Sequence, residues 1–272
     1  MPTSRANPPI AILTDFGYRD HYVGAMKGVI ARIAPAAPII DLTHGIPAQR
    51  VIAGAIALKQ SWRYFPKRTV FLAVVDPGVG TARLPIAIET RAGARFVGPD
   101  NGLLWPAANE AGIARAAELR AARYRLADVS STFHGRDIFA PAAAHLWSGV
   151  SLRSLGPAVK KVAKLSIAPI ERIGDALLGR VIYIDGFGNL VSNLDRDTVA
   201  RFAACFRRRK LLVRIESGAE MEILKAYGDA PVGAPLATFG SFELLEIAVR
   251  DGSAASFFSA GEGTRVSIVV SA

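Results

Sequence analysis

The sequence predicts an α/β protein with two domains: an N-terminal α/β sandwich around a mainly parallel central sheet, and a smaller C-terminal all-β barrel. Two patterns predict it. In the first part of the chain, apolar runs of strand length alternate with stretches whose apolar residues have helical spacing. In the second part, short strands follow one another, several separated by glycine and aspartate turns. With 272 residues, 51% of them hydrophobic, the chain has ample material for buried cores.

The N-terminal pattern begins with Ile10–Thr14, an apolar run that predicts a buried strand. Residues His21–Ile33 have helical spacing, and Pro35 ends that helix. The alternation continues with a strand at Ile39–Leu42, a helix at Val51–Trp62, a strand at Val70–Val75 and, later in the chain, a helix at Ile138–Trp147. Strands joined by helices in this order form right-handed crossovers, so we expect a parallel sheet.

The character of the chain changes at Ser151–Ile173, a lysine-containing stretch with Gly156-Pro157 that indicates a connection. We therefore place an N-terminal domain at residues 1–172 and a C-terminal domain at residues 173–272. Residues 1–8 are polar and contain prolines, which indicates a loose tail. The strands expected in the C-terminal domain are Val181–Ile184, Leu211–Ile215, Leu236–Thr238, Leu244–Val249 and Val266–Val270.

Composition narrows the classes of protein. The net charge is +10, and a basic protein can bind nucleic acid, but the densest basic run, Arg207–Lys210, contains no aromatic residue for base stacking. We expect a basic enzyme surface and no nucleic-acid partner. Cys205 is the only cysteine, and the four histidines form no HxxxH or HExxH pair, so we expect neither a disulfide nor a bound metal.

The apolar runs are shorter than the roughly 20 residues needed to cross a bilayer. The first of them, Ile10–Leu13, is too short for the apolar region of a secretory signal. We therefore expect no membrane association and a cytoplasmic location.

Polar residues with glycines follow the first and third predicted strands, where ligands bind in α/β sheets. Asp15 in the run Thr14-Asp15-Phe16-Gly17 can grip ribose hydroxyls or only shape a turn, while Asp20 is expected to cap the next helix. Asp76 begins a tight loop that ends at Arg83, which can return to it as an ion pair. The loop has neither the GxGxxG nor the P-loop pattern, so a phosphate site is disfavoured.

Three further segments combine glycine with polar residues. Gly98-Pro99-Asp100-Asn101-Gly102 is a typical structural turn. His134, in Phe133-His134-Gly135-Arg136-Asp137, lies at a helix N-terminus, which favours a neutral imidazole that can orient water or accept a proton. Taken alone, the segment favours a capping or core role for this histidine. In Asp185-Gly186-Phe187-Gly188-Asn189, Phe187 can stack on a base and Asn189 can contact a purine edge, or the segment is a plain hairpin.

Together the segments TDFGYRDHYVG, IIDLTHGIP, VVDPGVGTAR, GPDNGLL, FHGRD, IDGFGNLVSN and GSFELLEIAV resemble the S-adenosyl-L-methionine (SAM) hydroxide adenosyltransferases, or SAM hydrolases, relatives of the SAM-dependent fluorinase and chlorinase. The resemblance runs from about Ile10 to Val249. It implies hydrolysis of SAM to adenosine and L-methionine without a cofactor. It also implies a homotrimer in which SAM lies between the N-terminal domain of one subunit and the C-terminal domain of its neighbour.

The resemblance also assigns roles to single residues. Asp76, Arg83 and His134 would position the attacking water, and Asp15 would hold the ribose hydroxyls. The other implied substrate contacts are Asp20 and Tyr22 beside the ligand, Phe187 and Asn189 at the adenine, and Asp185 and Ser241 at the methionine end. Two positions differ from the family pattern: Gln49-Arg50 replaces an aromatic-then-acid pair, and Arg250 replaces a frequent asparagine.

Halogenases of this family resemble it but carry tyrosine where this chain has Asp76, and they lack a histidine matching His134. Hydrolysis is therefore favoured over halogenation. Two alternatives remain: a SAM-dependent halogenase, and a sensor that binds SAM or adenosine without turnover.

Overall fold

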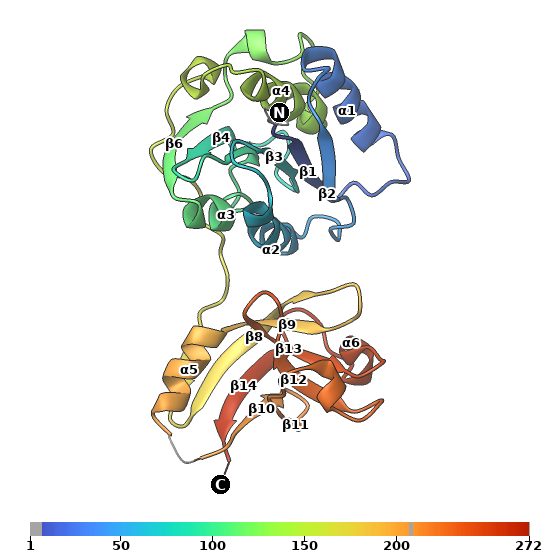
Figure 1. The fold of residues 1–272 in the computed structure, drawn as a ribbon, viewed down its shortest axis with the longest axis vertical. Coiled ribbons are helices and arrows are strands. Elements are labelled where there is room, and N and C mark those ends of the chain that lie inside the picture. The colour runs from blue at the N-terminus through green and yellow to red at the C-terminus, as the bar shows by residue number, and fades with distance from the viewer. Residues whose placement is uncertain (1–6, 207–208, 272) are drawn as a thin grey trace, which may run out of the picture. The chain divides into compact units, whose positions relative to one another are not determined.

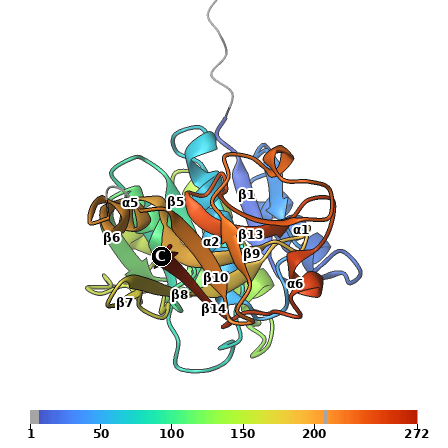
Figure 2. The ribbon, with the colours of Figure 1, turned by 90° about the horizontal axis from the view of Figure 1, so that it is seen from below.

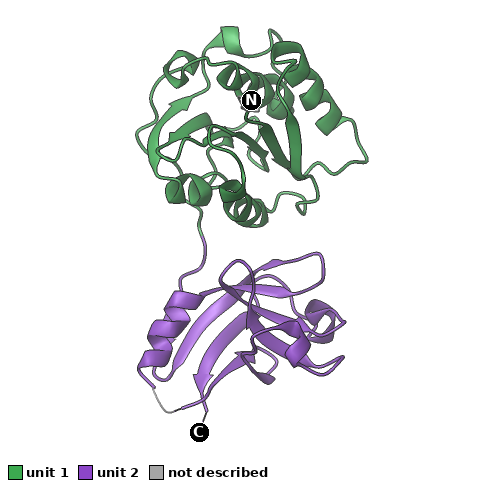
Figure 3. Cartoon of the chain, viewed as in Figure 1, with its two compact units in different colours: residues 1–166 green, residues 167–272 purple. Residues whose placement is uncertain are grey.

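The structure is a computed structural model that describes residues 7–206 and 209–271. The chain forms two compact units, residues 1–166 and 167–272, shown in separate colours in Figure 3. The expected division at residue 172 falls inside strand β7 (Glu171–Ile173), a short exposed strand without an apolar pattern. Of the expected N-terminal tail, residues 1–6 lie outside the described residues, as do residues 207 and 208 of the basic run.

The first unit is built on a six-stranded sheet with the order β2-β1-β3-β5-β4-β6. Strands β1, β2, β3 and β5 pair in parallel, and β4 runs antiparallel to both of its neighbours, β5 and β6. The bounds are β1 Ile10–Thr14, β2 Ile39–Thr43, β3 Val70–Val74, β4 Pro85–Thr90, β5 Arg95–Pro99 and β6 Ile113–Glu118. A short hairpin joins β4 to β5, which is why β4 is the reversed strand.

Helices cover both faces of this sheet. The helices are α1 (Tyr22–Ile33), α2 (Val51–Ser61), α3 (Trp105–Glu110) and α4 (Ala140–Trp147). Helices α1 and α4 contact each other over one face, and α2 and α3 contact each other over the other, as Figure 1 shows. None of the helices among the described residues combines the length and apolar character needed to span a membrane.

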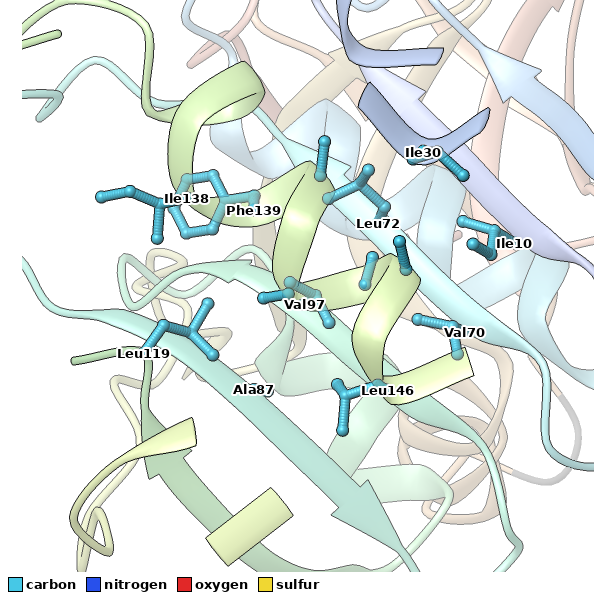
Figure 4. Packing of buried hydrophobic residues seen from close by; sticks show 14 of the residues in the cluster. Ile10, Ile30, Val70, Leu72, Ala87, Val97, Leu119, Ile138, Phe139 and Leu146 are labelled. Carbon is cyan, nitrogen blue, oxygen red and sulfur yellow. The ribbon is translucent and has the colours of Figure 1, made fainter. Parts of the chain in front are cut away.

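Strand β3 shows why the apolar runs of the sequence contain no polar alternation. Val70 and Leu72 belong to the core between the sheet and helices α1 and α4 (Figure 4). The side chain of Phe71, between them in sequence, points to the opposite face of the sheet. There its ring stacks on that of Phe96, with 5.1 Å between the centroids. Because the strand is buried on both faces, every position is apolar. The expected parallel α/β architecture is confirmed.

The second unit is one antiparallel sheet with the order β11-β10-β14-β8-β9-β13-β12, with β7 pairing to β8. Its curvature can be followed in Figures 1 and 2. Ile223, directly after β11, bridges to Ala237 of β12, so the two outer strands meet and nearly close a barrel. The further bounds are β8 Ala176–Ile184, β9 Leu190–Asp195, α5 Arg196–Ala204, β10 Leu211–Ile215, β11 Glu220–Glu222, β12 Pro235–Phe239, β13 Leu244–Val249, α6 Ala254–Phe257 and β14 Arg265–Val270. The expected barrel is confirmed.

Candidate active site

Asp15 and Asp76 follow neighbouring strands of the parallel sheet. Thr14 of β1 pairs with Val74 of β3, so the two aspartates leave the same edge of the sheet side by side. From β1 the chain goes through α1 to β2 on one side, and from β3 it continues towards β5 on the other side. Connections that diverge in this way leave a crevice outside the carboxyl ends of the strands, the usual ligand site of such sheets.

Asp76 is held by a two-pronged ion pair. The Nε atom of Arg83 donates to both carboxylate oxygens at 2.9 and 3.0 Å, and Nη2 donates to Oδ2 at 2.5 Å. The side chains of Arg83 and Asp76 are only 8% and 6% exposed. The guanidinium also lies over the ring of Phe139, 5.1 Å from its centroid. A bidentate, nearly buried pair of this kind fixes the direction of the carboxylate.

His134 contacts the same guanidinium. Nη2 of Arg83 lies 2.7 Å from Nδ1 of His134. A guanidinium nitrogen donates and cannot accept, so Nδ1 is the acceptor and a neutral imidazole carries its proton on Nε2. Burial, together with the charge of Arg83, lowers the pKa of His134 below its usual value. His134 is therefore neutral at pH 7, as expected, but its free nitrogen is a donor.

The turns around this set are held by backbone and buried contacts. His134 precedes one turn of π-helix over Gly135–Phe139 that leads into α4, and such π-helical turns are frequent at functional sites. Asp137, fully buried, accepts the backbone N–H of Ser130 at 2.8 Å and pairs with Arg136. Asn101 donates to the carbonyl of Val75 at 2.9 Å, next to Asp76. The segment Gly98–Gly102 thus supports the site as a structural turn.

Asp15, Asp76 and His134 line one hollow of about 290 Å³, together with Gln49 and Phe133. The backbone N–H of Gln49 donates to Oδ2 of Asp15 at 2.7 Å. Burial, and to a lesser degree the charge of Asp76, raises the pKa of Asp15. The structure therefore gathers three of the predicted residues around a space large enough for a water and part of a ligand, and it places the atypical Gln49 in its wall.

A partly buried polar network that includes Thr14, the neighbour of Asp15, was not expected from the sequence. Oγ1 of Thr14 lies 2.8 Å from Nδ1 of His44, whose Nε2 faces Oδ1 of Asp41 at 3.2 Å. Lys27 donates to the other oxygen of Asp41 at 2.7 Å. The carbonyl of His44 accepts the N–H of Gly17 at 2.8 Å, so the network ties the turn after β1 to strand β2. The sequence signal for this network was His44 in the segment Thr43-His44-Gly45, directly at the end of β2.

Asp20 and Tyr22 lie outside the residues that line this hollow. Asp20 is exposed, and the N-cap of α1 is His21 without a side-chain hydrogen bond, so the expectation that Asp20 caps the helix is wrong. Tyr22 is exposed but contacts two residues that line the hollow: its ring lies 5.6 Å from that of Phe16 and 5.1 Å from that of Phe133.

The predicted residues of the second unit line a separate pocket of about 850 Å³: Asp185, Phe187, Asn189 and Ser241. Asp185 organises the turn between β8 and β9. Its Oδ1 accepts the N–H groups of Phe187 and Asn189, and its Oδ2 accepts the side-chain amide of Asn189, each at 2.9 Å. Phe187 is 82% exposed, so its ring is available to a planar ligand. The atypical Arg250 also lines this pocket.

Two further pocket residues were missed by the sequence analysis. Glu246 of β13 is buried, and the hydroxyl of Tyr227 donates to its Oε2 at 2.7 Å. The signal for Glu246 was a single acidic residue inside the apolar run Leu244–Val249, where a charge is costly unless it has a role. Among the residues that the structure describes, no group of three or more His, Cys, Asp or Glu side chains could hold a metal ion.

Comparison with known proteins decides the family. Residues 10–156 match the SAM hydroxide adenosyltransferase N-terminal domain, and residues 179–267 match the SAM hydroxide adenosyltransferase C-terminal domain. The chain belongs to the SAM hydroxide adenosyltransferase family. The resemblance drawn from the seven sequence segments is thereby confirmed.

Relatives of this adenosyltransferase chain cover nearly its full length. Proteins named (R)-S-adenosyl-L-methionine hydrolase from Thermus thermophilus and Salinispora tropica are each 39% identical over 96% of this chain, and the matches cover 99% and 97% of those proteins. A protein named fluorinase from an Actinoplanes species is 28% identical, over 91% of this chain and 92% of its own. A solved structure of an uncharacterized conserved protein from Thermotoga maritima has a TM-score of 0.86 and 38% identity, covering 96% of this chain and 99% of that one.

Proposed function

We propose that this chain hydrolyses S-adenosyl-L-methionine to adenosine and L-methionine. The observation that carries the proposal is the Asp76–Arg83–His134 set at the edge of the parallel sheet, where Asp15 also lies. The relatives named as hydrolases are more similar to this chain than the listed fluorinase, at 39% against 28% identity. The sequence pattern at Asp76 and His134 likewise favours water over halide as the nucleophile.

In the proposed reaction a water attacks the ribose C5′ carbon in line with the sulfonium sulfur. The new bond joins the water oxygen to C5′, the C5′–S bond breaks, and its electron pair leaves with the neutral thioether of methionine. The proton lost by the water passes to Asp76 and then to solvent. A sulfonium is already an excellent leaving group, so its departure needs no Lewis acid, and we propose that the enzyme uses no cofactor.

The hydrogen bonds of the set divide the roles of its members. Asp76 is the acceptor for the water, since His134 presents Nε2–H to any molecule in the hollow. His134 can therefore donate to the water oxygen while one lone pair of that oxygen faces C5′. This role differs from the sequence-based expectation that His134 accepts a proton. Orienting the nucleophile can supply up to about 7–11 kcal/mol of the barrier reduction.

We propose that the remaining predicted residues bind the substrate: Asp15 at the ribose hydroxyls, Asp20 and Tyr22 beside the ligand, Phe187 and Asn189 at the adenine, and Asp185 and Ser241 at the methionine end. Asn189 donates its amide N–H to Asp185, which leaves its amide oxygen for the adenine amino group. Following the family resemblance, we further propose a cytoplasmic homotrimer with its sites at subunit interfaces, a prediction that light scattering on the purified chain can check.

The relatives' names specify an (R) form of the substrate. Because L-methionine already fixes its α-carbon, the label refers to the sulfonium centre. We propose the same preference for this chain. With a mixture of the two sulfonium epimers, consumption should stop once the (R) form is exhausted, and a remaining pool of (S)-SAM should be found.

The test of the function is to incubate the purified chain with SAM and chloride and to identify the products by chromatography. Adenosine and methionine are expected. His134→Ala and Asp76→Ala should each lose most turnover while adenosine still binds. His145→Ala is the matched control, because His145 lies on α4 outside the lining of the hollow.

Any other result of this experiment would indicate a different function or a different assignment of the active-site residues. Formation of 5′-chloro-5′-deoxyadenosine would identify a halogenase. Intact SAM that raises the melting temperature would identify a sensor. Full turnover in both active-site variants would contradict the assignment of Asp76 and His134.

A further inference from the structure

Glu246 is a buried acidic side chain in the pocket of the second unit. It lies in strand β13 between Leu245 and Ile247, both fully buried, and is itself only 5% exposed. It nevertheless lines the pocket of about 850 Å³ that contains Asp185 and Ser241. A buried carboxylate is costly unless something compensates its charge.

The contacts of Glu246 leave half of its carboxylate available. Oε2 accepts the hydroxyl of Tyr227 at 2.7 Å. None of the described residues donates a hydrogen bond to Oε1, and Oε1 is not sealed from the pocket. A Cβ at Gly240 would collide with this carboxylate, so a glycine before Ser241 is what lets Glu246 lie beside that segment.

The surrounding charges favour a cation. Burial, followed by the nearby charge of Asp185, raises the pKa of Glu246. Asp251 adds a further acidic group to the lining. The one basic side chain of the described lining, Arg250, donates to the carbonyls of Gly228 and Ala230 at 3.0 and 2.7 Å. Among the described residues that line the pocket, no basic side chain forms an ion pair with Glu246.

We propose that Glu246 accepts a hydrogen bond from the α-ammonium group of the substrate's methionine end, and so selects ligands with an amino acid end over adenosine. The inference rests on the proposed function and extends it to a residue outside the predicted set. The ammonium is a charged donor that would compensate the buried carboxylate. The adenine amino group, the other donor on the substrate, is neutral and would not.

The test compares two ligands on the full-length chain by calorimetry. S-adenosylhomocysteine carries the amino acid end but no sulfonium, and adenosine lacks that end. Glu246→Gln should weaken S-adenosylhomocysteine about tenfold, since it removes a charge-assisted hydrogen bond, and should leave adenosine affinity unchanged. Glu243→Gln is the matched control: this glutamate lies three residues earlier, with a side chain 63% exposed and paired with Arg196.

Unchanged S-adenosylhomocysteine affinity in Glu246→Gln would overturn the proposal. An equal loss for both ligands would also overturn it, because it would indicate an adenine contact or a structural role. Tyr227→Phe provides a second variant should the first one not fold. It keeps the carboxylate, so the preference for S-adenosylhomocysteine should persist, and its loss would contradict the proposal. These experiments measure binding and not turnover. If the chain shows the expected difference in affinity but leaves SAM intact, the proposed hydrolysis is refuted while the role of Glu246 in binding stands.

Discussion

A single guanidinium fixes the tautomer of the candidate catalytic histidine. Arg83 contacts both Asp76 and His134, donating to each. It thereby fixes the proton of a neutral His134 on Nε2 and adds a positive charge next to the ring. The pKa of His134 is lowered first by burial and then by Arg83, and it is raised by Asp76. The two partners of the set thus act on the histidine in opposite directions.

This opposition predicts opposite shifts in two variants. Arg83→Met removes the charge that lowers the pKa of His134, so the pKa should rise towards or above its ordinary value near 6.5. Asp76→Asn removes a charge that raises it, so the pKa should fall further. NMR titration of the His134 ring in each variant measures both changes. An unchanged pKa in both variants would show that burial alone controls the ring.

The same contacts predict how turnover of the wild-type protein depends on pH. Below the lowered pKa, His134 binds a proton on Nδ1 and loses its hydrogen bond from Arg83. Turnover should therefore persist as the pH falls through 6.5, where an ordinary histidine is half protonated, and decline only at lower pH. A decline centred at or above pH 6.5 in the dependence of kcat on pH would contradict the lowered pKa.

The sequence motifs predicted which residues line the two pockets better than they predicted which side chains contact each other there. Asp15, Asp76 and His134 meet in one hollow, and Asp185, Phe187, Asn189 and Ser241 meet in one pocket. Tyr227 and Glu246 were missed because their contact joins residues 19 positions apart on separate elements. A strand pattern gives only the face of a side chain, and the neighbour across that face depends on how the barrel closes.

At the scale of elements, the proposed catalytic set depends on a contact between two loops. Gly80, in the loop between Asp76 and Arg83, has a φ of 76°, and a Cβ there would lie 2.7 Å from the carbonyl oxygen of Ser131. Ser131 belongs to the segment that leads to His134. The close approach of the two backbones therefore sets the distance between the ion pair and the histidine.

Gly80→Ala should push these loops apart and reduce kcat by about 100-fold, the effect expected for a displacement of about 1 Å in a catalytic group. Gly149→Ala is the control, since Gly149 also has a positive φ, of 95°, but has open space around it. Both variants should lose stability, by about 1–3 kcal/mol from backbone strain. Equal kcat values in the two variants would show that the loop contact does not position the set.

Element prediction succeeded where burial imposes a pattern. The apolar runs at β1 and β3 and the helical spacing of α1 matched the structure within one residue at each end. No element was predicted for β4, β5, α3 or β6. In β6, the edge strand Ile113–Glu118, exposed positions such as Arg115 interrupt the apolar pattern. The turn of π-helix before α4 was also missed, since its side-chain spacing differs little from that of an α-helix.

For the whole molecule, charge opposes the proposed substrate. The chain has a net charge of +10, while SAM at neutral pH carries one net positive charge from its sulfonium, ammonium and carboxylate groups. Long-range repulsion should slow the approach of SAM. The acidic side chains that we propose to meet SAM, Asp15, Asp76, Asp185 and Glu246, would act only at short range, and their burial would protect their attraction from screening.

Salt should therefore increase the efficiency of the enzyme. As the screening length falls from about 30 Å at 0.01 M to about 10 Å at 0.1 M, the repulsion of the whole molecule weakens more than the attraction within the site. We expect kcat/KM for SAM to rise by about twofold or more over this range, while the affinity for neutral adenosine stays constant. Steady-state kinetics with sodium chloride and with sodium sulfate, matched for ionic strength, separate screening from a specific effect of chloride. A fall in kcat/KM with ionic strength in both salts would mean that the acidic groups of the site dominate the approach of SAM over the basic surface.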